Sequence, residues 1–197
     1  YTVTTPLNGG TQFFWRVKSK NDCGESSYSA TSNFTTAVPS YCPSTFTDDA
    51  GGSEFISNIT FNTINNSSTN STTDGYEDFT TIGTTVKRGE THQISVTFDT
   101  GGYQDHCYVF IDWNQDFEFD NNTERYDLGT GFDDVSTLTA NITIPANALL
   151  GATRMRVVIE YTHTNSPHGN GACDADHAEE WGRSEEHTSE LHHVAIS

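Results

Sequence analysis

The sequence predicts an all-β fold, an antiparallel β-sandwich of jelly-roll-like form. Short stretches rich in Val, Ile, Thr, Phe and Tyr alternate apolar and polar residues between clusters of Gly, Asn and Asp, which is the pattern of half-buried strands. No stretch of the sequence keeps an apolar period of 3.6 residues, so we expect no long helix. Hydrophobic residues make up 33% of the 197 residues and aromatic residues 12%, which is enough for a core and argues against global disorder.

Eight segments fit the strand pattern. In chain order they are residues 13–18, 28–35, 55–61, 76–82, 93–98, 107–113, 138–144 and 153–161. Apolar residues occupy every second position of segments 93–98 and 138–144, so each of these strands is expected to bury one face. Residues 145–150 lie between Pro145 and Gly151 and are expected to form a turn that leads into the last strand.

A domain boundary is predicted at residues 38–40. Pro39 follows a Thr-rich strand and prevents its hydrogen-bonded ladder from continuing. The piece before the boundary, residues 1–37, is too short to fold alone, whereas the piece after it, residues 41–182, is long enough for a domain with its own core. We therefore expect residues 38–40 to link two units.

The first piece carries a short series of spaced residues. They are Leu7, Thr11 and Phe13, then Trp15-Arg16-Val17 and, near the end, Phe34-Thr35-Thr36. In this order they resemble the last two strands of a fibronectin type III domain. That family has an aromatic residue at the Phe13 position whose hydroxyl forms the tyrosine corner, and phenylalanine lacks that hydroxyl. The resemblance implies that residues 1–37 are the C-terminal remnant of an Ig-like domain.

The second piece carries a longer series of motifs. They are Tyr41-Cys42, Phe55-Ile56-Ser57-Asn58-Ile59, Gly75-Tyr76-Glu77-Asp78-Phe79-Thr80, Phe110-Ile111-Asp112-Trp113-Asn114-Gln115-Asp116, Gly151-Ala152-Thr153-Arg154-Met155-Arg156 and Cys173. In this order they resemble the GEVED domain, a β-rich module of secreted and surface proteins of Bacteroidota. In that family the module is a non-catalytic companion of fibronectin type III repeats, secreted metalloproteases and a secretion-sorting domain. The resemblance implies an extracellular or cell-surface location.

The sequence departs from that family after Gly182. The family signature behind the second cysteine reads Gly-Glu-x-Glu-Asp-Tyr and leads into a closing strand, whereas this chain continues Arg183-Ser184-Glu185-Glu186-His187-Thr188-Ser189-Glu190-Leu191. That string looks like a translated sequencing adapter. We therefore predict that residues 183–197 are an artefactual tail and exclude them from functional expectations. This also excludes His187, His192 and His193, which could be mistaken for a metal cluster.

The strongest candidate site is an acidic loop behind a predicted strand. Oxygen-bearing side chains recur there on alternate residues, namely Asp112, Asn114, Asp116, Glu118 and Asp120. Calcium takes six to eight oxygen ligands, and crowded carboxylates repel one another without a cation. Measured against an EF-hand loop, the sixth position is Phe117 instead of glycine and the twelfth is Thr123. The loop is thus a candidate calcium site of another kind, with further oxygens from Glu124, Asp127 or a distant segment. The alternative is that Asp and Asn only form turns.

A second, weaker acidic group follows Cys173. It consists of Asp174, Asp176, Glu179 and Glu180. These residues could complete the calcium shell or form a site of their own, but an acidic loop that is simply solvated is the more frequent arrangement.

The four cysteines, Cys23, Cys42, Cys107 and Cys173, are widely spaced. They include no C-x-x-C pair, which argues against zinc and redox motifs. Three disulfide pairings are open. Because Cys42 and Cys173 bracket the second piece, a bridge between them would close a long loop and stabilise the module in an oxidising compartment. Cys23 is expected to lack its partner, and Cys107 fits a buried free thiol as well as a bridge.

Composition and motif content indicate a non-catalytic module. Nine Lys and Arg against 27 Asp and Glu give a net charge of −18, which argues against nucleic-acid binding. The sequence contains no H-E-x-x-H, no G-x-S-x-G, no glycine-rich phosphate loop and no apolar run that could span a membrane. We expect a role in adhesion, substrate targeting or spacing. The expected partner is an extracellular protein, a polysaccharide or other domains of the same chain.

Two alternatives are open. In one, the parent chain is a secreted hydrolase such as a metalloprotease, and this region is its accessory domain. In the other, the region is a carbohydrate-binding module that uses exposed aromatic residues such as Tyr103, Tyr126 or Trp181. Trp15 and Trp113 lie in predicted strands and are expected to pack in the core.

Overall fold

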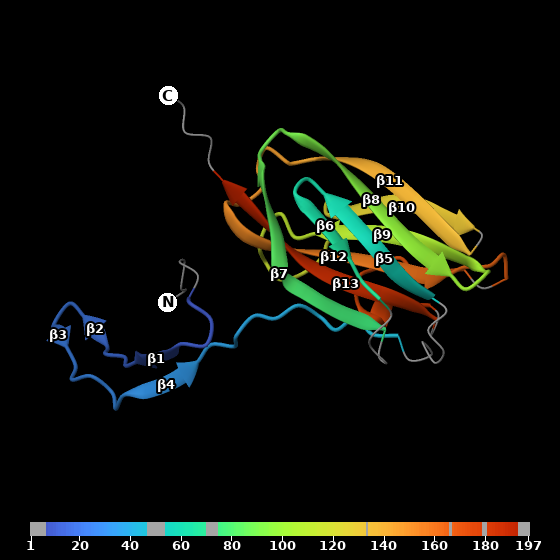
Figure 1. Cartoon of the computed structure of the whole chain (residues 1–197). Coiled ribbons are helices and arrows are strands. Elements are labelled where there is room, and N and C mark those ends of the chain that lie inside the picture. Colours follow the sequence, from blue (N-terminus) through green and yellow to red (C-terminus); the bar gives the residue numbers. More distant parts are fainter. Residues whose placement is uncertain are drawn as a thin grey trace, which may run out of the picture. The chain divides into compact units, whose positions relative to one another are not determined.

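The computed structural model of the chain describes residues 7–46, 54–69, 75–132, 134–165, 167–178 and 181–192. The chain divides into two compact units, residues 1–41 and residues 42–197. Strands form the regular structure of both units (Figure 1), and the one helical element within the described ranges is a 3-10 turn, η1 (Asp174–Asp176). The predicted all-β fold is therefore confirmed.

The smaller unit contains two short antiparallel ribbons. β1 (Gln12–Trp15) pairs with β4 (Ser32–Thr35), and β2 (Lys20–Asn21) pairs with β3 (Gly24–Glu25). Phe13 and Phe34 stack across the first ribbon, with ring centroids 5.8 Å apart. Trp15 is 49% exposed, so its predicted core position is wrong; the sheets in the described part of this unit are two-stranded ribbons. The Ig-like origin of this unit stays a prediction.

The larger unit is a sandwich of two sheets. Its strands in chain order are β5 (Glu54–Phe61), β6 (Ile64–Ser67), β7 (Tyr76–Lys87), β8 (Thr91–Thr100), β9 (Gln104–Ile111), β10 (Arg125–Phe132), β11 (Val135–Thr143), β12 (Gly151–Tyr161) and β13 (Gly182–His192). One sheet has the order β10-β9-β12-β13-β7 and the other β11-β8-β5-β6. Neighbouring strands run antiparallel, as predicted, except that β13 and β7 are parallel.

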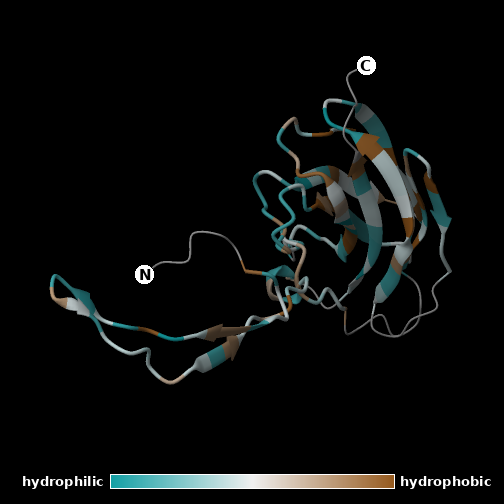
Figure 2. Ribbon diagram, turned by 90° about the vertical axis from the view of Figure 1, so that its left-hand side faces the viewer, coloured by the Kyte–Doolittle hydropathy of each residue, from teal (hydrophilic) through white to brown (hydrophobic). Residues whose placement is uncertain are grey.

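The main core lies between the two sheets. From β8, Ile94, Val96 and Phe98 are fully buried, as the alternation in residues 93–98 predicts. They pack in one cluster with apolar side chains of β9 and β12 in the opposite sheet, among them Val109 and Val157. Figure 2 shows hydrophobic residues as brown segments along the strands of this unit. The two facing apolar surfaces hold the sandwich together because their burial removes apolar area from water.

The five-stranded sheet is buried on its outer face as well. β9 and β12 each carry a nearly continuous run of buried residues instead of an alternation. Tyr108, Phe110 and Val158 point outward and form a second cluster with Phe46 and Ala172, which belong to the segments before β5 and after β12. Burial of both faces explains why residues 107–111 and 157–159 are apolar without alternation.

β13 lies inside the five-stranded sheet, between β12 and β7. The module predicted from the sequence ends at Gly182, whereas in the structure the sheet continues to His192. Gly182 starts the strand with a φ of 149°, and a Cβ at this position would lie 2.4 Å from the Ile159 carbonyl oxygen. The next five residues, Arg183 to His187, are at most 1% exposed.

The position of β13 has a physical reason. Without a strand there, β12 would present a row of unpaired backbone groups inside the sandwich, which is unfavourable. The fold therefore uses residues 182–192 as a structural strand. Their origin in an adapter stays a prediction, and His193 lies outside the described residues.

We expect Val96→Ala to lower the free energy of unfolding by about 2 kcal/mol, because the lost carbons leave a cavity between the sheets. Val135→Ala removes the same atoms at a position that is 61% exposed, and should change stability by less than about 0.5 kcal/mol. Urea unfolding followed by tryptophan fluorescence measures both values. Equal losses for the two variants would contradict this assignment of the core.

Candidate functional site

The acidic loop that the sequence predicts as a calcium site follows β9 and closes on its own backbone. Asp112 is fully buried, and its amide donates to the Arg154 carbonyl at 3.1 Å, which ties the start of the loop to β12. The Asp112 carboxylate accepts the backbone N–H groups of Asp116 and Phe117 at 3.3 and 3.1 Å. Asp112 therefore holds the loop in a tight turn.

The backbone of this loop is left-handed at two residues. Gln115 has a φ of 56° and Phe117 a φ of 70°, values that residues other than glycine seldom adopt. Phe117 occupies the sixth position of the loop, where an EF-hand has glycine. Phe117 therefore adopts the left-handed conformation that glycine favours, although it is not a glycine.

Glu124 closes the other end of the loop. It is 2% exposed, and its carboxylate accepts the N–H groups of Trp113, Asn114 and Asp120 at 2.8, 3.2 and 3.0 Å. Burial raises the pKa of Glu124, and these amides act in the opposite direction. Glu124 is predicted from the sequence as a further calcium ligand; in the structure its carboxylate fixes the shape of the loop.

The remaining candidate ligands of the loop are exposed and bonded locally. Asp116 accepts the Glu118 amide at 3.0 Å, and Asp120 accepts the amides of Asn122 and Thr123 at 2.9 and 2.8 Å. Across the described ranges, no group of three or more His, Cys, Asp or Glu side chains is placed to hold a metal ion. The loop is thus not preassembled for calcium, which would have to draw several oxygens away from backbone amides.

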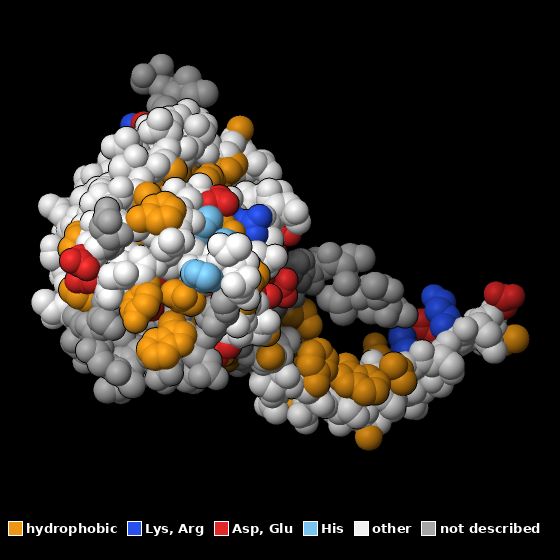
Figure 3. Space-filling view, turned by 90° about the vertical axis from the view of Figure 1, so that its right-hand side faces the viewer, with side chains coloured by type: hydrophobic (Ala, Val, Ile, Leu, Met, Phe, Trp, Pro, Cys, Tyr) orange, Lys and Arg blue, Asp and Glu red, His pale blue; other side chains and the backbone are white. Residues whose placement is uncertain are grey.

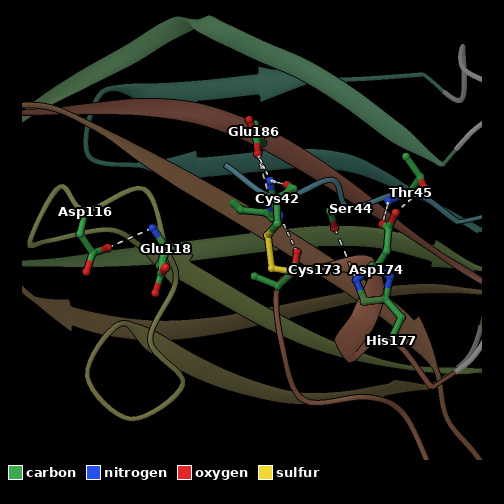
Figure 4. The surroundings of a disulfide bond; sticks show 11 residues. Cys42, Ser44, Thr45, Asp116, Glu118, Cys173, Asp174, His177 and Glu186 are labelled. Atoms are coloured by element: carbon green, nitrogen blue, oxygen red, sulfur yellow. Dashed lines mark hydrogen bonds and ion pairs between the residues drawn. A yellow bond between two sulfur atoms is a disulfide. The ribbon is translucent and has the colours of Figure 1, made fainter. Parts of the chain in front are cut away.

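The second acidic group does not join this loop. Asp174 accepts the amide of Thr45 at 2.6 Å and its hydroxyl at 3.2 Å. Figure 4 shows Asp174 on one side of the disulfide and the turn of Asp116 and Glu118 on the other. Asp176, in η1, is exposed like Asp174. The other two members of the group, at positions 179 and 180, lie outside the described residues.

The predicted disulfide between Cys42 and Cys173 is confirmed. Its Cα atoms lie 5.6 Å apart and it joins residues 131 positions apart in sequence. Arg156 is buried and donates to the carbonyls of Cys42 and Ala172 at 2.7 and 2.5 Å. Its Nε donates to Glu186 of β13 at 2.8 Å. Arg156 therefore connects β12 and β13 to both segments that the disulfide holds.

The two other cysteines are free. Cys23 is exposed in the smaller unit. Cys107 is fully buried in β9, where burial raises the pKa of its thiol. A thiol in such surroundings stays protonated and unreactive. Of the two alternatives left open for Cys107, the structure has the buried free thiol.

The structure brings two of the histidines together. The rings of His106 and His168 stack with centroids 3.8 Å apart. The Nε2 atom of His106 lies 2.8 Å from Asp127 and its Nδ1 atom 2.9 Å from the Thr130 hydroxyl. Burial lowers the pKa of His106, and the neighbouring His168 adds to this effect. Because both ring nitrogens of His106 are engaged within the protein, the pair is a packing contact.

A pocket at one end of the sandwich was not foreseen from the sequence. It measures about 270 Å³ and is lined by Glu54, Tyr103, Tyr161 and Trp181. Tyr103 and Tyr161 meet edge to face with ring centroids 6.0 Å apart. Tyr103 is 61% exposed and Trp181 43%. Figure 3 shows this end of the molecule, where hydrophobic and aromatic side chains gather beside histidines.

The other aromatic candidates serve the core. Trp113 is 4% exposed in the main cluster, as predicted. Its indole N–H donates to the hydroxyl of Tyr126 at 2.8 Å, and the Tyr126 ring packs against the same cluster. Tyr126 is therefore not an exposed platform, unlike Tyr103 and Trp181.

Asp105 of β9 is an acid whose neighbour across the sheet lines the end pocket. Its Cα partner across the sheet is Tyr161, so both side chains lie on one face. That face carries Cys107 two residues further along β9 and points between the sheets. Asp105 is fully buried, and neither carboxylate oxygen has a hydrogen-bond partner among the described residues. Burial, followed by the carboxylates of Glu54 and Asp99, raises the pKa of Asp105 from 3.8 to about 8.

The fold and these contacts define a disulfide-bonded β-sandwich module. Residues 106–190 match the family model of the GEVED domain, so the chain is similar to that family over this segment, as the sequence motifs predict. The comparison with curated proteins gives no match.

Two solved structures show a weak likeness. One is a family 123 glycoside hydrolase from Clostridium perfringens, with 10% identity, 60% of this chain and 23% of that chain covered, and a TM-score of 0.36. The other is Spo0M, a sporulation control protein from Bacillus subtilis, with 11% identity, coverage of 56% and 46%, and a TM-score of 0.32. The chain spans less than half of either structure, and likenesses at this level say nothing about function.

The family match includes residues beyond Gly182. It ends at residue 190, inside β13. With Gly182 as the first residue of Gly-Glu-x-Glu-Asp-Tyr, the two adjacent acidic positions fall on Glu185 and Glu186. The second and sixth positions depart from the signature, with Arg183 and His187 in place of Glu and Tyr. The segment thus keeps a carboxylate where Arg156 is bound.

Asp105→Asn is expected to change how stability depends on pH. The folded protein keeps the Asp105 proton up to about pH 8, whereas an unfolded Asp loses it near pH 4. Wild-type stability should therefore fall as the pH rises between these values, by up to roughly 1.4 kcal/mol per pH unit from this group. Asparagine does not titrate, so from about pH 5 to about pH 8 the variant should gain stability relative to wild type.

Urea unfolding of both proteins at the two pH values measures this difference. Asp134→Asn, an exposed acid at the same end of the sandwich, is the control and should show no such trend. A difference between Asp105→Asn and wild type that is the same at both pH values would refute a buried, protonated Asp105.

Proposed function

We propose that the larger unit is a non-catalytic module of an extracellular or cell-surface protein, with a role in adhesion, substrate targeting or spacing. The Cys42–Cys173 disulfide carries this proposal. It joins the two segments that cover the outer face of the five-stranded sheet, and disulfides persist in oxidising compartments. The match of residues 106–190 to the GEVED domain supports the same function.

The proposed partner is an extracellular protein, a polysaccharide or another domain of the same chain. The net charge of −18 disfavours nucleic acid. The described part of the chain has no helix that is long and apolar enough to cross a bilayer. The buried carboxylates of Asp112 and Glu124 bind backbone amides of their own loop, which supports a structural instead of a catalytic use of these acids.

Removal of the disulfide tests the proposal. Cys42→Ser should lower the free energy of unfolding by about 2–5 kcal/mol, because the bridge restricts a long loop of the unfolded chain and anchors the outer layer. Reductant should lower the Tm of the wild type in the same way. Protein exported to the bacterial periplasm should contain the bridge, and protein made in a reducing cytosol should lack it and unfold more readily.

Cys23→Ser is the matched control, since Cys23 is a free, exposed cysteine; it should leave the Tm unchanged with and without reductant. If the oxidised and reduced wild type unfold at the same temperature, the disulfide does not stabilise the module. The disulfide would then give no support to a role in an oxidising compartment.

We also propose calcium as a ligand of the loop from Asp112 to Asp120. Asn114, Asp116 and Glu118 are exposed, so their oxygens can turn toward a cation without disturbing the core. The left-handed turn at Phe117 resembles the turn that wraps an EF-hand loop around its ion.

A free calcium concentration ten times the Kd should raise the free energy of unfolding by about 1.4 kcal/mol. The effect is measured as a higher Tm in calcium than in chelator. Asp116→Ala should remove most of this increase. Asp174→Ala, across the disulfide, should leave it intact. A wild-type Tm that is identical in calcium and chelator would rule out calcium at this loop.

A further inference from the structure

A second, larger hollow lies beside the end pocket. It measures about 480 Å³ and shares Tyr103 and Tyr161 with that pocket. Its other lining residues come from the start of β9, the end of β10 and the segments that follow β10 and β12, among them Gln104, Phe132 and Asp134. The two hollows together form the rim site. The larger hollow falls in the size range of pockets that bind small molecules.

Four aromatic side chains form the walls of the rim site. Tyr103 and Phe132 are 61% and 54% exposed, and Trp181 is 43% exposed, so core packing does not explain these three rings. Tyr161 meets the Tyr103 ring edge to face, with the ring centroids 6.0 Å apart. Exposed apolar side chains that gather at one place of a folded module are typical of a binding surface.

Backbone hydrogen bonds fix the segments that carry these side chains. The Tyr103 amide donates to the Thr100 carbonyl at 3.0 Å, and the Thr100 amide donates to the Asp134 carbonyl at 2.9 Å. These two bonds join the turn before β9 to the turn after β10. The Thr162 amide donates to the Gln104 carbonyl at 2.8 Å, which adds the segment after β12. The site is therefore built on three neighbouring strands, and such preorganisation lowers the entropy that binding costs.

Hydrogen-bonding side chains line the larger hollow beside the rings. They include Gln104, Asp134 and Thr162, whose side chains have no hydrogen-bond partner in the described part of the chain. The Nδ1 atom of His163 accepts the Asn165 amide at 3.3 Å, so in the neutral ring Nε2 carries the proton and can donate. The lining thus offers a carboxylate acceptor, an imidazole donor, and an amide and a hydroxyl that do both.

The charge of the rim site disfavours anionic ligands. Among the residues that the structure describes, its linings include the acids Glu54 and Asp134 and contain neither Lys nor Arg. The whole chain carries a net charge of −18. A uronate or a sulfate ester would therefore be repelled as it approaches, whereas an uncharged ligand would not.

We propose that the rim site binds a neutral pyranose sugar of a glycan chain. The C–H face of the sugar stacks on an exposed aromatic ring, whose face carries partial negative charge. The sugar hydroxyls bond to the side chains of Gln104, Asp134 and His163. Because each hydroxyl both donates and accepts, a sugar matches the mixture of donors and acceptors in the lining. This inference rests on the proposed function and deepens it, since it names the class of partner and the surface that binds it.

A polypeptide fits the rim site less well than a sugar does. Peptides often bind to β-sheets by adding a strand to an exposed edge. β9 and β12, which carry Gln104 and Tyr161, are each paired with a strand on both sides, so neither offers a free edge at the site. A sugar needs only the rings and the polar side chains.

Affinity gel electrophoresis of the whole chain tests the proposal. The neutral probes are mixed-linkage β-glucan, galactomannan, glucomannan and arabinoxylan; alginate is the anionic probe and gelatin the polypeptide probe. At least one neutral polysaccharide should retard the wild type, with a Kd obtained from retardation against polysaccharide concentration. Alginate and gelatin should not retard it. Trp181→Ala and Tyr103→Ala should each raise the Kd at least tenfold.

Matched variants separate the rim site from exposed side chains elsewhere. Trp15→Ala removes an indole that is 49% exposed in the smaller unit and should leave the Kd unchanged. Asp134→Ala should raise the Kd about tenfold through loss of a charged acceptor, and Asp22→Ala, an exposed acid of the smaller unit, should not. All four side chains are exposed, so each variant should keep the Tm of the wild type.

Three results would overturn the proposal. They are no retardation by any of the four neutral polysaccharides, retardation by alginate or gelatin alone, and a Kd of Trp181→Ala and Tyr103→Ala equal to that of the wild type. The Tm of the wild type in reductant tests the extracellular module separately. A chain whose Tm falls in reductant but which binds no neutral polysaccharide would overturn the sugar site and leave the proposed function supported.

Discussion

The larger unit depends on one buried charge pair, Arg156 with Glu186. The guanidinium group lies on the outer face of the five-stranded sheet and is 1% exposed. It donates to Glu186 of β13 and to the backbone carbonyls of Cys42 and Ala172, which flank the disulfide. Loss of the Glu186 carboxylate would remove the counter-charge of the buried Arg156 guanidinium, whereas Glu186 itself also pairs with Arg154. The central strands and the segments that cover them therefore form as one structure.

Strand prediction succeeded where one face of a strand is buried. The alternation in residues 93–98 reappears in β8, whose apolar positions are the buried ones. No strand was predicted over β13, because residues 183–197 were set aside as an artefactual tail; the segment is also polar although it lies inside the sheet. The position of β13 is determined by backbone hydrogen bonding to β12 and β7. The periodicity of side chains along a sequence does not predict such backbone pairing. β10 was missed because Gly129 and Gly131 interrupt its apolar pattern.

The members of a site could be predicted as a group only where they are neighbours in sequence; Tyr103 and Trp181 were predicted singly, as exposed aromatic residues. The acidic loop is conspicuous because its oxygens recur within one short segment, and the structure indeed forms a single turn there. Asp105, Glu54 and Trp181 come from three distant segments, which only the pairing of strands brings together. One local signal existed: Asp105 continues the core-facing positions of Cys107 and Val109 and puts a charge where an apolar residue is expected. Which residues lie next to Asp105 depends on the register between strands, and the sequence of a single strand does not determine that register.

The parallel contact between β13 and β7 sets the order in which the sheet can close. β7 precedes β8 in the chain, but it reaches β12 only through β13, so it has no place in the sheet until residues 182–192 have been synthesised. Pairings of such long sequence separation form slowly, because the intervening chain must first be confined. In a chain that crosses a membrane unfolded, the sandwich would become complete only after this segment has emerged. Closure of the sheet thereby depends on β13, which follows all of its other strands in the chain.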